Sequence, residues 1–174
     1  VPNVELAEQS GLATANGITV DANLLTEDPD ISAVGDAVTF PCIHADGSPT
    51  RLESVQNAAD QARNVAARLT GNPVAYETLP WFWSDQGDLK LQIAGIGQGH
   101  DRTVELGVDN DRQKLVLCFK GDNLVAVETV NRPGDHMVAR RILVREHRPT
   151  VAEASAPGFG LKEWEQSHAL STAP

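Results

Sequence analysis

The sequence has 174 residues, of which 41% are hydrophobic and 22% charged, as in an ordinary globular protein. Its formal charge of −10 argues against nucleic-acid binding, because contacts to phosphates require a basic face. No apolar run approaches the roughly 20 residues of a transmembrane helix, so we expect no membrane-spanning segment. Cys42 and Cys118 lie far apart and form no CxxC pair, so we expect a cytoplasmic protein with reduced thiols.

The first residue of the chain is not an initiator methionine. The chain starts at Val1, and its only methionine is Met137. No signal-peptide pattern opens it. We therefore expect this chain to have been cleaved or cut from a longer protein.

The first 50 residues carry short strand and turn signals. Asn16-Gly17 predicts a tight turn, and the segment from Ile18 to Val20 alternates as a strand does. The apolar run from Ile31 to Val34 stops at Gly35-Asp36 and predicts a strand buried on both faces. Residues 40–50 are rich in turn-forming residue types, so we expect a loop there.

The strongest helical pattern runs from Glu53 to Leu69. Five apolar residues share one stripe at helical spacing, which is typical of a face that packs on a core: Ala58, Ala62, Val65, Ala66 and Leu69. Gly71 and Pro73 then end the helix. The pattern changes after this point, and we divide the chain into domains of residues 1–74 and 75–174.

The second domain has the alternating pattern of an antiparallel sheet. Four strands are predicted, at residues 89–93, 102–106, 114–119 and 124–130. Gly121-Asp122-Asn123 predicts a hairpin turn between the last two. A helix is predicted from about Gly134 to Val144, and a short amphipathic segment from Leu161 to Leu170.

Several motifs follow one another in the order of a known family. They are Gly17-Ile18-x-Val20-Asp21, Thr26-x-Asp28-Pro29-x-Ile31-x-Ala33-x-Gly35-Asp36, Arg51-x-Glu53-Ser54-x-x-Asn57-Ala58-x-x-Gln61-Ala62, Pro80-Trp81-Phe82-Trp83-Ser84-Asp85-Gln86 and Val130-Asn131-Arg132-Pro133. The chain resembles the putidaredoxin and rhodocoxin reductase-like FAD-dependent NAD(P)H:ferredoxin reductases, of the pyridine nucleotide-disulfide oxidoreductase superfamily. Apoptosis-inducing factor is a more distant relative. The resemblance implies an α+β or α/β fragment: the end of a Rossmann-like FAD-binding domain, followed by a C-terminal interface domain with an antiparallel sheet.

The resemblance also implies a set of FAD-binding residues. Asp36 of the Gly35-Asp36 motif would hydrogen-bond the ribityl chain of FAD, although a Gly-Asp pair is also common in plain turns. Ser54, Val55 and Gln56 would offer backbone groups to the flavin pyrimidine edge, where the positive end of a helix favours negative charge. The alternative for Ser54 is a role as a helix cap alone.

The resemblance places Trp83 beside the flavin ring, on the side from which electrons leave for the ferredoxin. A tryptophan can stack on a flat ring and exclude water from it. The alternative is that Trp81, Phe82 and Trp83 form a hydrophobic seam between the two domains. For Trp81 we favour the seam.

The chain lacks the motifs that hydride transfer to FAD requires. A GxGxxG turn that opens a helix is needed for each dinucleotide, and neither occurs here. The resemblance places the missing FAD turn and the NAD(P)H site outside this chain, in N-terminal domains of the parent protein. We therefore expect the isolated chain to be inactive.

The remaining charged and metal-ligating residues give weaker signals. Arg63 and Arg68 are candidates for docking a [2Fe–2S] ferredoxin, since the resemblance starts their helix near the flavin. A second basic cluster, Arg140, Arg141, Arg145 and Arg148, is expected to be solvated or paired with acids such as Glu146. The five histidines do not occur at metal-ligand spacing, so we expect no metal site: His44, His100, His136, His147 and His168.

The function expected from the resemblance is electron transfer by the parent protein. Electrons would pass from NAD(P)H through FAD to a [2Fe–2S] ferredoxin that serves a P450 or a ring-hydroxylating oxygenase. One alternative is a non-catalytic protein-interaction module. Another is a flavoprotein with a different acceptor, similar to apoptosis-inducing factor or linked to a nitrite reductase.

Overall fold

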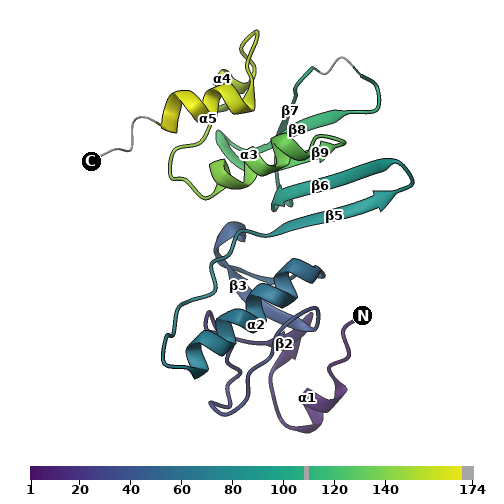
Figure 1. Ribbon diagram of the computed structural model, residues 1–174. Coiled ribbons are helices and arrows are strands. Elements are labelled where there is room, and N and C mark those ends of the chain that lie inside the picture. The colour runs from purple at the N-terminus through teal and green to yellow at the C-terminus, as the bar shows by residue number, and fades with distance from the viewer. Residues whose placement is uncertain (108–109, 170–174) are drawn as a thin grey trace. The chain divides into compact units, whose positions relative to one another are not determined.

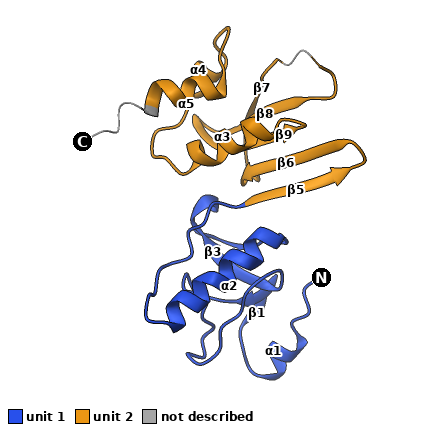
Figure 2. Cartoon of the chain, viewed as in Figure 1, with its two compact units in different colours: residues 1–80 blue, residues 81–174 orange. Residues whose placement is uncertain are grey.

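The computed structural model describes residues 1–107 and 110–169, and for Ala169 the backbone alone. The chain divides into two compact units, unit 1 from Val1 to Pro80 and unit 2 from Trp81 to Pro174 (Figure 1 and Figure 2). The domain boundary between residues 74 and 75 stays a prediction. Among the described residues, no helix combines the length and the apolar character needed to cross a bilayer.

Unit 1 contains a small mixed sheet and one long helix. The sheet has the order β1-β2-β3-β4, with β1 at Thr14–Ala15, β2 at Gly17–Thr19, β3 at Val38–Cys42 and β4 at Ser48–Arg51. Strands β2 and β3 run parallel, and the other pairs are antiparallel. The helices are α1 (Glu5–Gln9), a 3-10 turn η1 (Ile43–Ala45) and α2 (Val55–Leu69). The predicted strand near residue 18 and the long helix are confirmed.

The predicted tight turn at Asn16-Gly17 joins β1 to β2. Ala15 pairs with Gly17 across it. Gly17 has a φ of 133°, and a Cβ added to it would lie 2.7 Å from the carbonyl oxygen of Ala37. Glycine therefore lets β2 approach the chain that leads into β3.

Two predictions for this region are wrong. The run from Ile31 to Val34 is not a buried strand, because Ile31 is 37% and Val34 is 40% exposed and only an isolated bridge forms there. Residues 40–50 are not a plain loop, because β3 and β4 form an antiparallel hairpin around η1. Pro41 and Pro49, which predicted the loop, pair with each other in this hairpin. Both missing N–H groups thus fall at one position of the ladder.

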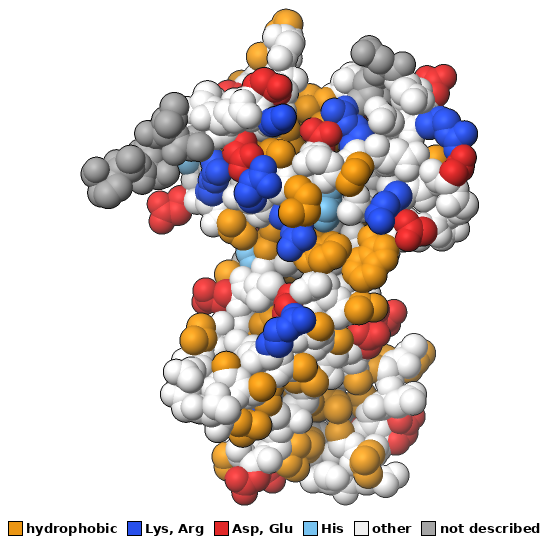
Figure 3. All heavy atoms as spheres, viewed as in Figure 1, with side chains coloured by type: hydrophobic (Ala, Val, Ile, Leu, Met, Phe, Trp, Pro, Cys, Tyr) orange, Lys and Arg blue, Asp and Glu red, His pale blue; other side chains and the backbone are white. Residues whose placement is uncertain are grey.

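Helix α2 buries a polar face and exposes three of the five residues of its apolar stripe. Asn57 and Gln61 are 4% and 0% exposed, whereas Ala62 and Ala66 are exposed and Leu69 is 74% exposed. Hydrophobic side chains are visible on the surface of unit 1 in Figure 3. The buried polar groups have partners: Oε1 of Gln61 accepts from the backbone N–H of Gly35 at 2.7 Å. The expectation that the apolar stripe faces the core is therefore wrong for Ala62, Ala66 and Leu69, whereas Ala58 and Val65 are half-buried.

Unit 2 is built on an antiparallel sheet of five strands. Its order is β5-β6-β9-β8-β7, with β5 at Trp81–Gln86, β6 at Leu89–Gly95, β7 at Arg102–Glu105, β8 at Lys114–Lys120 and β9 at Asn123–Val130. The four predicted strands are confirmed, and β5 is an addition. Lys120 pairs with Asn123 around Gly121-Asp122, which confirms the predicted hairpin turn.

Among the described residues of unit 2, three helices accompany the sheet. Helix α3 (Pro133–Leu143) packs on β6 and β9, and α5 (Leu161–Ala169) packs on α3, with the short α4 (Val151–Ala154) before it. Leu170, the predicted end of the last segment, lies outside the described residues. The core is apolar and includes Leu115, Leu117, Phe119, Leu124, Val127, Ile142, Leu143 and Leu161.

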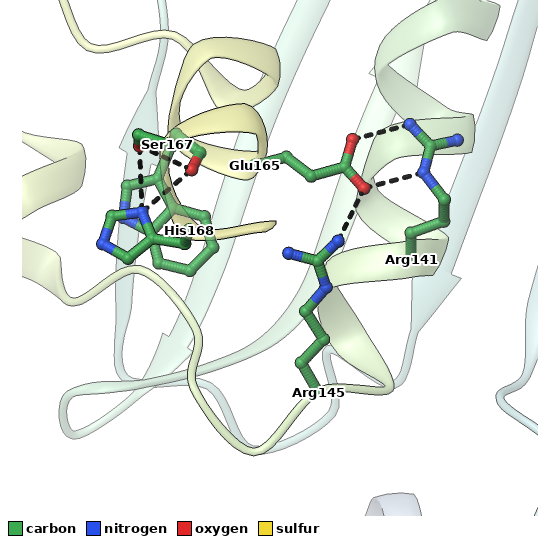
Figure 4. A network of polar contacts seen from close by, with 6 residues as sticks. Arg141, Arg145, Glu165, Ser167 and His168 are labelled. Carbon is green, nitrogen blue, oxygen red and sulfur yellow. Dashed lines mark hydrogen bonds and ion pairs between the residues drawn. The ribbon is translucent and has the colours of Figure 1, made fainter. Parts of the chain in front are cut away.

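A buried carboxylate joins α5 to α3. Glu165 accepts from both Nε and Nη2 of Arg141 at 2.7 Å and from Nη2 of Arg145 at 3.0 Å (Figure 4). These donors, Arg141 first, hold the pKa of Glu165 below its ordinary value although the side chain is only 9% exposed. The two-pronged Arg141 contact fixes the orientation of one helix on the other.

His136 is the most deeply buried titratable side chain of α3. It is 1% exposed, and neither ring nitrogen has a hydrogen-bond partner among the described residues. Its ring lies 5.5 Å from the ring of Trp81. Burial, with a smaller effect of the Arg140 charge, lowers the pKa of His136 to about 4.

We predict that His136 makes unit 2 less stable in mild acid. Its pKa is about 4 in the folded chain and about 6.5 when unfolded. The unfolded state therefore binds the proton first, and stability falls as the pH drops through this window, by up to about 3 kcal/mol. Denaturant unfolding of the wild type and of His136→Leu, from neutral pH to pH about 4, measures the loss. An equal loss in both proteins would contradict the prediction.

We predict that Gln61→Ala destabilises unit 1 by about 1–3 kcal/mol, because it leaves the buried N–H of Gly35 without its acceptor. Gln56→Ala is the matched control on the same helix. The Gln56 side chain is half-buried and bonds Asp60 within α2, so its loss costs under about 0.5 kcal/mol. Denaturant unfolding measures the free energy of unfolding of both variants. Similar decreases in the two would contradict the assigned contribution of the Gly35 contact.

Candidate functional site

The Gly35-Asp36 turn precedes β3 and has a left-handed glycine. Gly35 is buried, with a φ of 84°, a conformation that L side chains rarely adopt. Its N–H donates to Gln61, and its carbonyl accepts from the N–H of Val38 at 3.2 Å. Both backbone groups of Gly35 are therefore fixed by the surrounding fold.

Asp36 is held through its backbone, and its side chain is exposed. The carbonyl oxygen of Asp36 accepts from Nη1 of Arg51 at 3.0 Å. Arg51 also pairs with Glu53 and donates from Nε to Asn16 at 3.2 Å. Arg51 holds the pKa of Glu53 below its ordinary value. Gln61 and Arg51 thus clamp the turn at two successive residues and leave the Asp36 carboxylate at the surface.

The start of α2 lies beside this turn. Ser54 is the N-cap, with extended backbone, and its hydroxyl accepts from the N–H of Asn57 at 3.4 Å. Val55, the first helical residue, is 73% exposed. The side chain of Gln56 donates to Asp60 at 2.7 Å. Because Arg51 contacts both Asp36 and Glu53, the structure brings the turn and the positive end of α2 together.

A buried polar layer behind the site was not predicted from the sequence. Nδ2 of Asn57 donates to the carbonyl of Leu52 at 3.3 Å, and the hydroxyl of Tyr76 donates to Oδ1 of Asn57 at 3.1 Å. Burial raises the pKa of Tyr76. Nε2 of Gln61 is buried and has no hydrogen-bond partner among the described residues. The available signal was two amide residues four apart, which share one helix face.

Trp83 belongs to β5 of unit 2 and is 41% exposed. Its ring lies 5.3 Å from the ring of Trp81. Trp81 is half-buried, and the guanidinium of Arg140 lies 4.4 Å from its ring centroid. Trp83 and the Gly35-Asp36 turn lie in different units, so both its flavin role and the seam remain predictions.

The predicted docking arginines differ in their surroundings. The side chain of Arg63 is 71% exposed and pairs with Asp60 at 2.7 Å. Arg68 is half-buried and donates to the hydroxyl of Ser32 at 2.5 Å. Arg63 thus presents the more accessible charge, and ferredoxin docking by either residue stays a prediction.

The second basic cluster has local partners. Arg140 lies over the ring of Trp81, and Arg141 and Arg145 pair with Glu165. Arg148 donates to the carbonyl of Leu124 at 3.1 Å. These contacts account for the cluster within unit 2, and the acid that pairs with it comes from α5.

Two protein-family models match the chain. Residues 1–62 match the pyridine nucleotide-disulphide oxidoreductase model, and residues 81–164 match the reductase C-terminal model. Rhodocoxin reductase of Rhodococcus erythropolis is 48% identical over 162 residues, which cover 93% of this chain and 38% of that protein. The chain spans about two fifths of the length of the curated relatives it matches.

Solved structures give the same result. The ferredoxin reductase for the CYP199A2 system of Rhodopseudomonas palustris is 49% identical, with a TM-score of 0.87 over 94% of this chain and 40% of that one. A covalent putidaredoxin reductase–putidaredoxin complex matches at 35% identity and a TM-score of 0.88, over 99% of this chain and 41% of that one. The chain is therefore similar to the C-terminal portion of ferredoxin reductases and combines segments that match the pyridine nucleotide-disulphide oxidoreductase and reductase C-terminal models.

Proposed function

We propose that this chain is part of a flavoprotein reductase that passes electrons from NAD(P)H through FAD to a [2Fe–2S] ferredoxin. The ferredoxin in turn serves a P450 or a ring-hydroxylating oxygenase. The observation that carries the proposal is the Gly35-Asp36 turn, which Gln61 and Arg51 clamp beside the N-terminus of α2. The similarity to rhodocoxin reductase and to the ferredoxin reductase of the CYP199A2 system supports it.

The residues at this edge of unit 1 fit the chemistry of FAD. Asp36 offers an exposed carboxylate, which accepts hydrogen bonds from hydroxyl groups such as those of a ribityl chain. The N–H groups of Val55 and Gln56 at the positive end of α2 favour a polar ring edge that gains negative charge. FAD supplies the redox chemistry itself, by accepting a hydride and releasing single electrons. The residues of this chain bind and orient it.

The exposed apolar stripe of α2 supports a larger parent protein. Ala62, Ala66 and Leu69 are exposed on one helix face. Another part of the parent protein would bury this apolar face and remove it from water. We infer that the other FAD-binding segments of the parent cover this stripe. The NAD(P)H site belongs to the same missing part.

The remaining proposed residues are Trp83 of unit 2 and Arg63 of unit 1. We assign to Trp83 a place beside the flavin ring, where its exposed indole would exclude water from the path of the electrons. Arg63, with its accessible charge, is the better of the two candidates for meeting an acidic ferredoxin.

In the full-length parent protein, we predict that Asp36→Ala weakens FAD binding roughly tenfold or more, because a charge-assisted hydrogen bond contributes about 1.5–3 kcal/mol. Flavin fluorescence during titration of the apoprotein measures the dissociation constant. Asp30→Ala, at another exposed aspartate of unit 1, is the control and should bind as the wild type does. If the parent shows no flavin absorption at all, the non-catalytic interaction module replaces the reductase.

The isolated 174-residue chain should not oxidise NADH when FAD is added. It carries neither of the two glycine-rich turns that bind the dinucleotides. The decline of NADH absorbance against a blank without protein tests this, with the full-length protein as the positive control. Turnover by the purified chain above the blank would refute the assignment of the NAD(P)H site to the missing part.

A further inference from the structure

Two histidines and a glutamate of unit 2 lie together, outside the candidate cofactor site. His147 follows α3, Glu153 lies in α4 and His168 lies in α5. Each offers one ligand atom, and the three atoms lie within 4.8 Å of one another. Glu153 and His168 are half-buried, and His147 is exposed. Two imidazoles and one carboxylate form a donor set that Zn²⁺ uses in proteins, with water as the fourth ligand.

The hydrogen bonds of His168 indicate which of its nitrogens can bind a metal. Its Nδ1 lies 2.9 Å from the carbonyl oxygen of Trp164 and 3.0 Å from the hydroxyl of Ser167, which Figure 4 shows beside it. A carbonyl oxygen only accepts, so Nδ1 carries the proton and the ring lone pair lies on Nε2. Metal-binding histidines commonly donate their other N–H to a backbone carbonyl in this way.

Glu153 is also held in one orientation. Its Oε2 accepts from the N–H of Thr150 at 2.8 Å and from the Thr150 hydroxyl at 2.7 Å. Its Oε1 accepts from Nε1 of Trp164 at 3.2 Å. A carboxylate oxygen has two lone pairs, so Oε1 can accept this bond and still ligate an ion. The outer contacts of the carboxylate thus resemble those of a preorganised ligand.

Ring packing already orders the two imidazoles. His168 stacks on Trp164 with centroids 4.2 Å apart and an interplanar angle of 18°. The ring of His147 lies 5.4 Å from Trp164 and 5.1 Å from His168. This packing is the alternative explanation of the cluster, and it predicts no affinity for metal.

The positive charges next to His147 in sequence have contacts elsewhere. Arg145 pairs with Glu165, and Arg148 donates to the carbonyls of Leu124 and Arg145. These contacts hold both guanidinium groups. The chain as a whole carries a formal charge of −10, which favours the approach of a cation.

We propose that His147, Glu153 and His168 bind one divalent transition-metal ion of the Zn²⁺ type. In a tetrahedral site with bonds of about 2.0–2.1 Å the ligand atoms lie roughly 3.4 Å apart, so from separations within 4.8 Å they approach one another by at most roughly 1.4 Å on binding. The ion joins α4, α5 and the segment after α3, three parts of the chain that are brought together only by the fold. It stabilises the C-terminal part of unit 2.

The test uses the tag-free, chelator-treated 174-residue chain. Calorimetric titration with Zn²⁺ should give one ion per chain with a micromolar or lower dissociation constant, and Co²⁺ should give the visible absorption of a site with nitrogen and oxygen ligands. At a metal concentration one hundred times the dissociation constant, Tm should rise by roughly 5–10 °C.

Three variants separate coordination from ring packing. His147→Ala and His168→Ala should each weaken Zn²⁺ binding roughly tenfold or more. His100→Ala, at an exposed histidine of the same unit outside the cluster, should bind Zn²⁺ as the wild type does. His147 is exposed, so circular dichroism should show an intact fold in His147→Ala. Failure of the wild type to bind millimolar Zn²⁺, or unchanged affinity in a folded His147→Ala, would overturn the proposal.

Discussion

The hydrogen bond from the N–H of Gly35 to Gln61 is the interaction on which the candidate cofactor site depends. The two residues are 26 positions apart in the chain, and both are buried. A left-handed turn at this depth needs a residue without a Cβ, and its N–H needs an acceptor that water does not supply. Gln61 meets the second need. Asp36 can therefore stand at the surface of a fixed turn rather than of a mobile loop.

The need to satisfy buried backbone groups also distinguishes the interior face of α2 in unit 1 from the core of unit 2. Unit 2 is stabilised by an apolar core between its sheet and its helices, with Phe119 and Leu124 fully buried. In unit 1, α2 directs amides inward, and Asn57 and Gln61 bond backbone groups there. Three apolar residues of the same helix, Ala62, Ala66 and Leu69, remain at the surface. A helix with this arrangement packs polar groups on one partner and, in the proposed parent, apolar groups on another.

How far the sequence predicts the fold depends on whether a signal is local. Strands β6 to β9 and the turn at Gly121 follow from alternation and turn chemistry, and the structure confirms them. The extent of α2 was predicted, but its buried face was not, because periodicity records hydrophobicity and not the partners of Asn57 and Gln61. The prediction of a buried strand at Ile31 was wrong for a related reason, since an apolar stretch is buried only where another element covers it. Asp36 was found through the resemblance, and its clamp by Arg51 and Gln61 requires tertiary contacts that no motif spacing encodes.

The histidine cluster of unit 2 likewise could not be predicted from the sequence. No local spacing predicts a metal site, because His147, Glu153 and His168 approach one another only after α5 packs on α3 through Glu165. Stacking on Trp164 and metal coordination are not exclusive. The stacking has already removed much of the rotational freedom of His168, and Thr150 has done so for Glu153. The entropy cost of ordering these two side chains is therefore largely met by folding, and an ion that binds there loses less free energy to that cost.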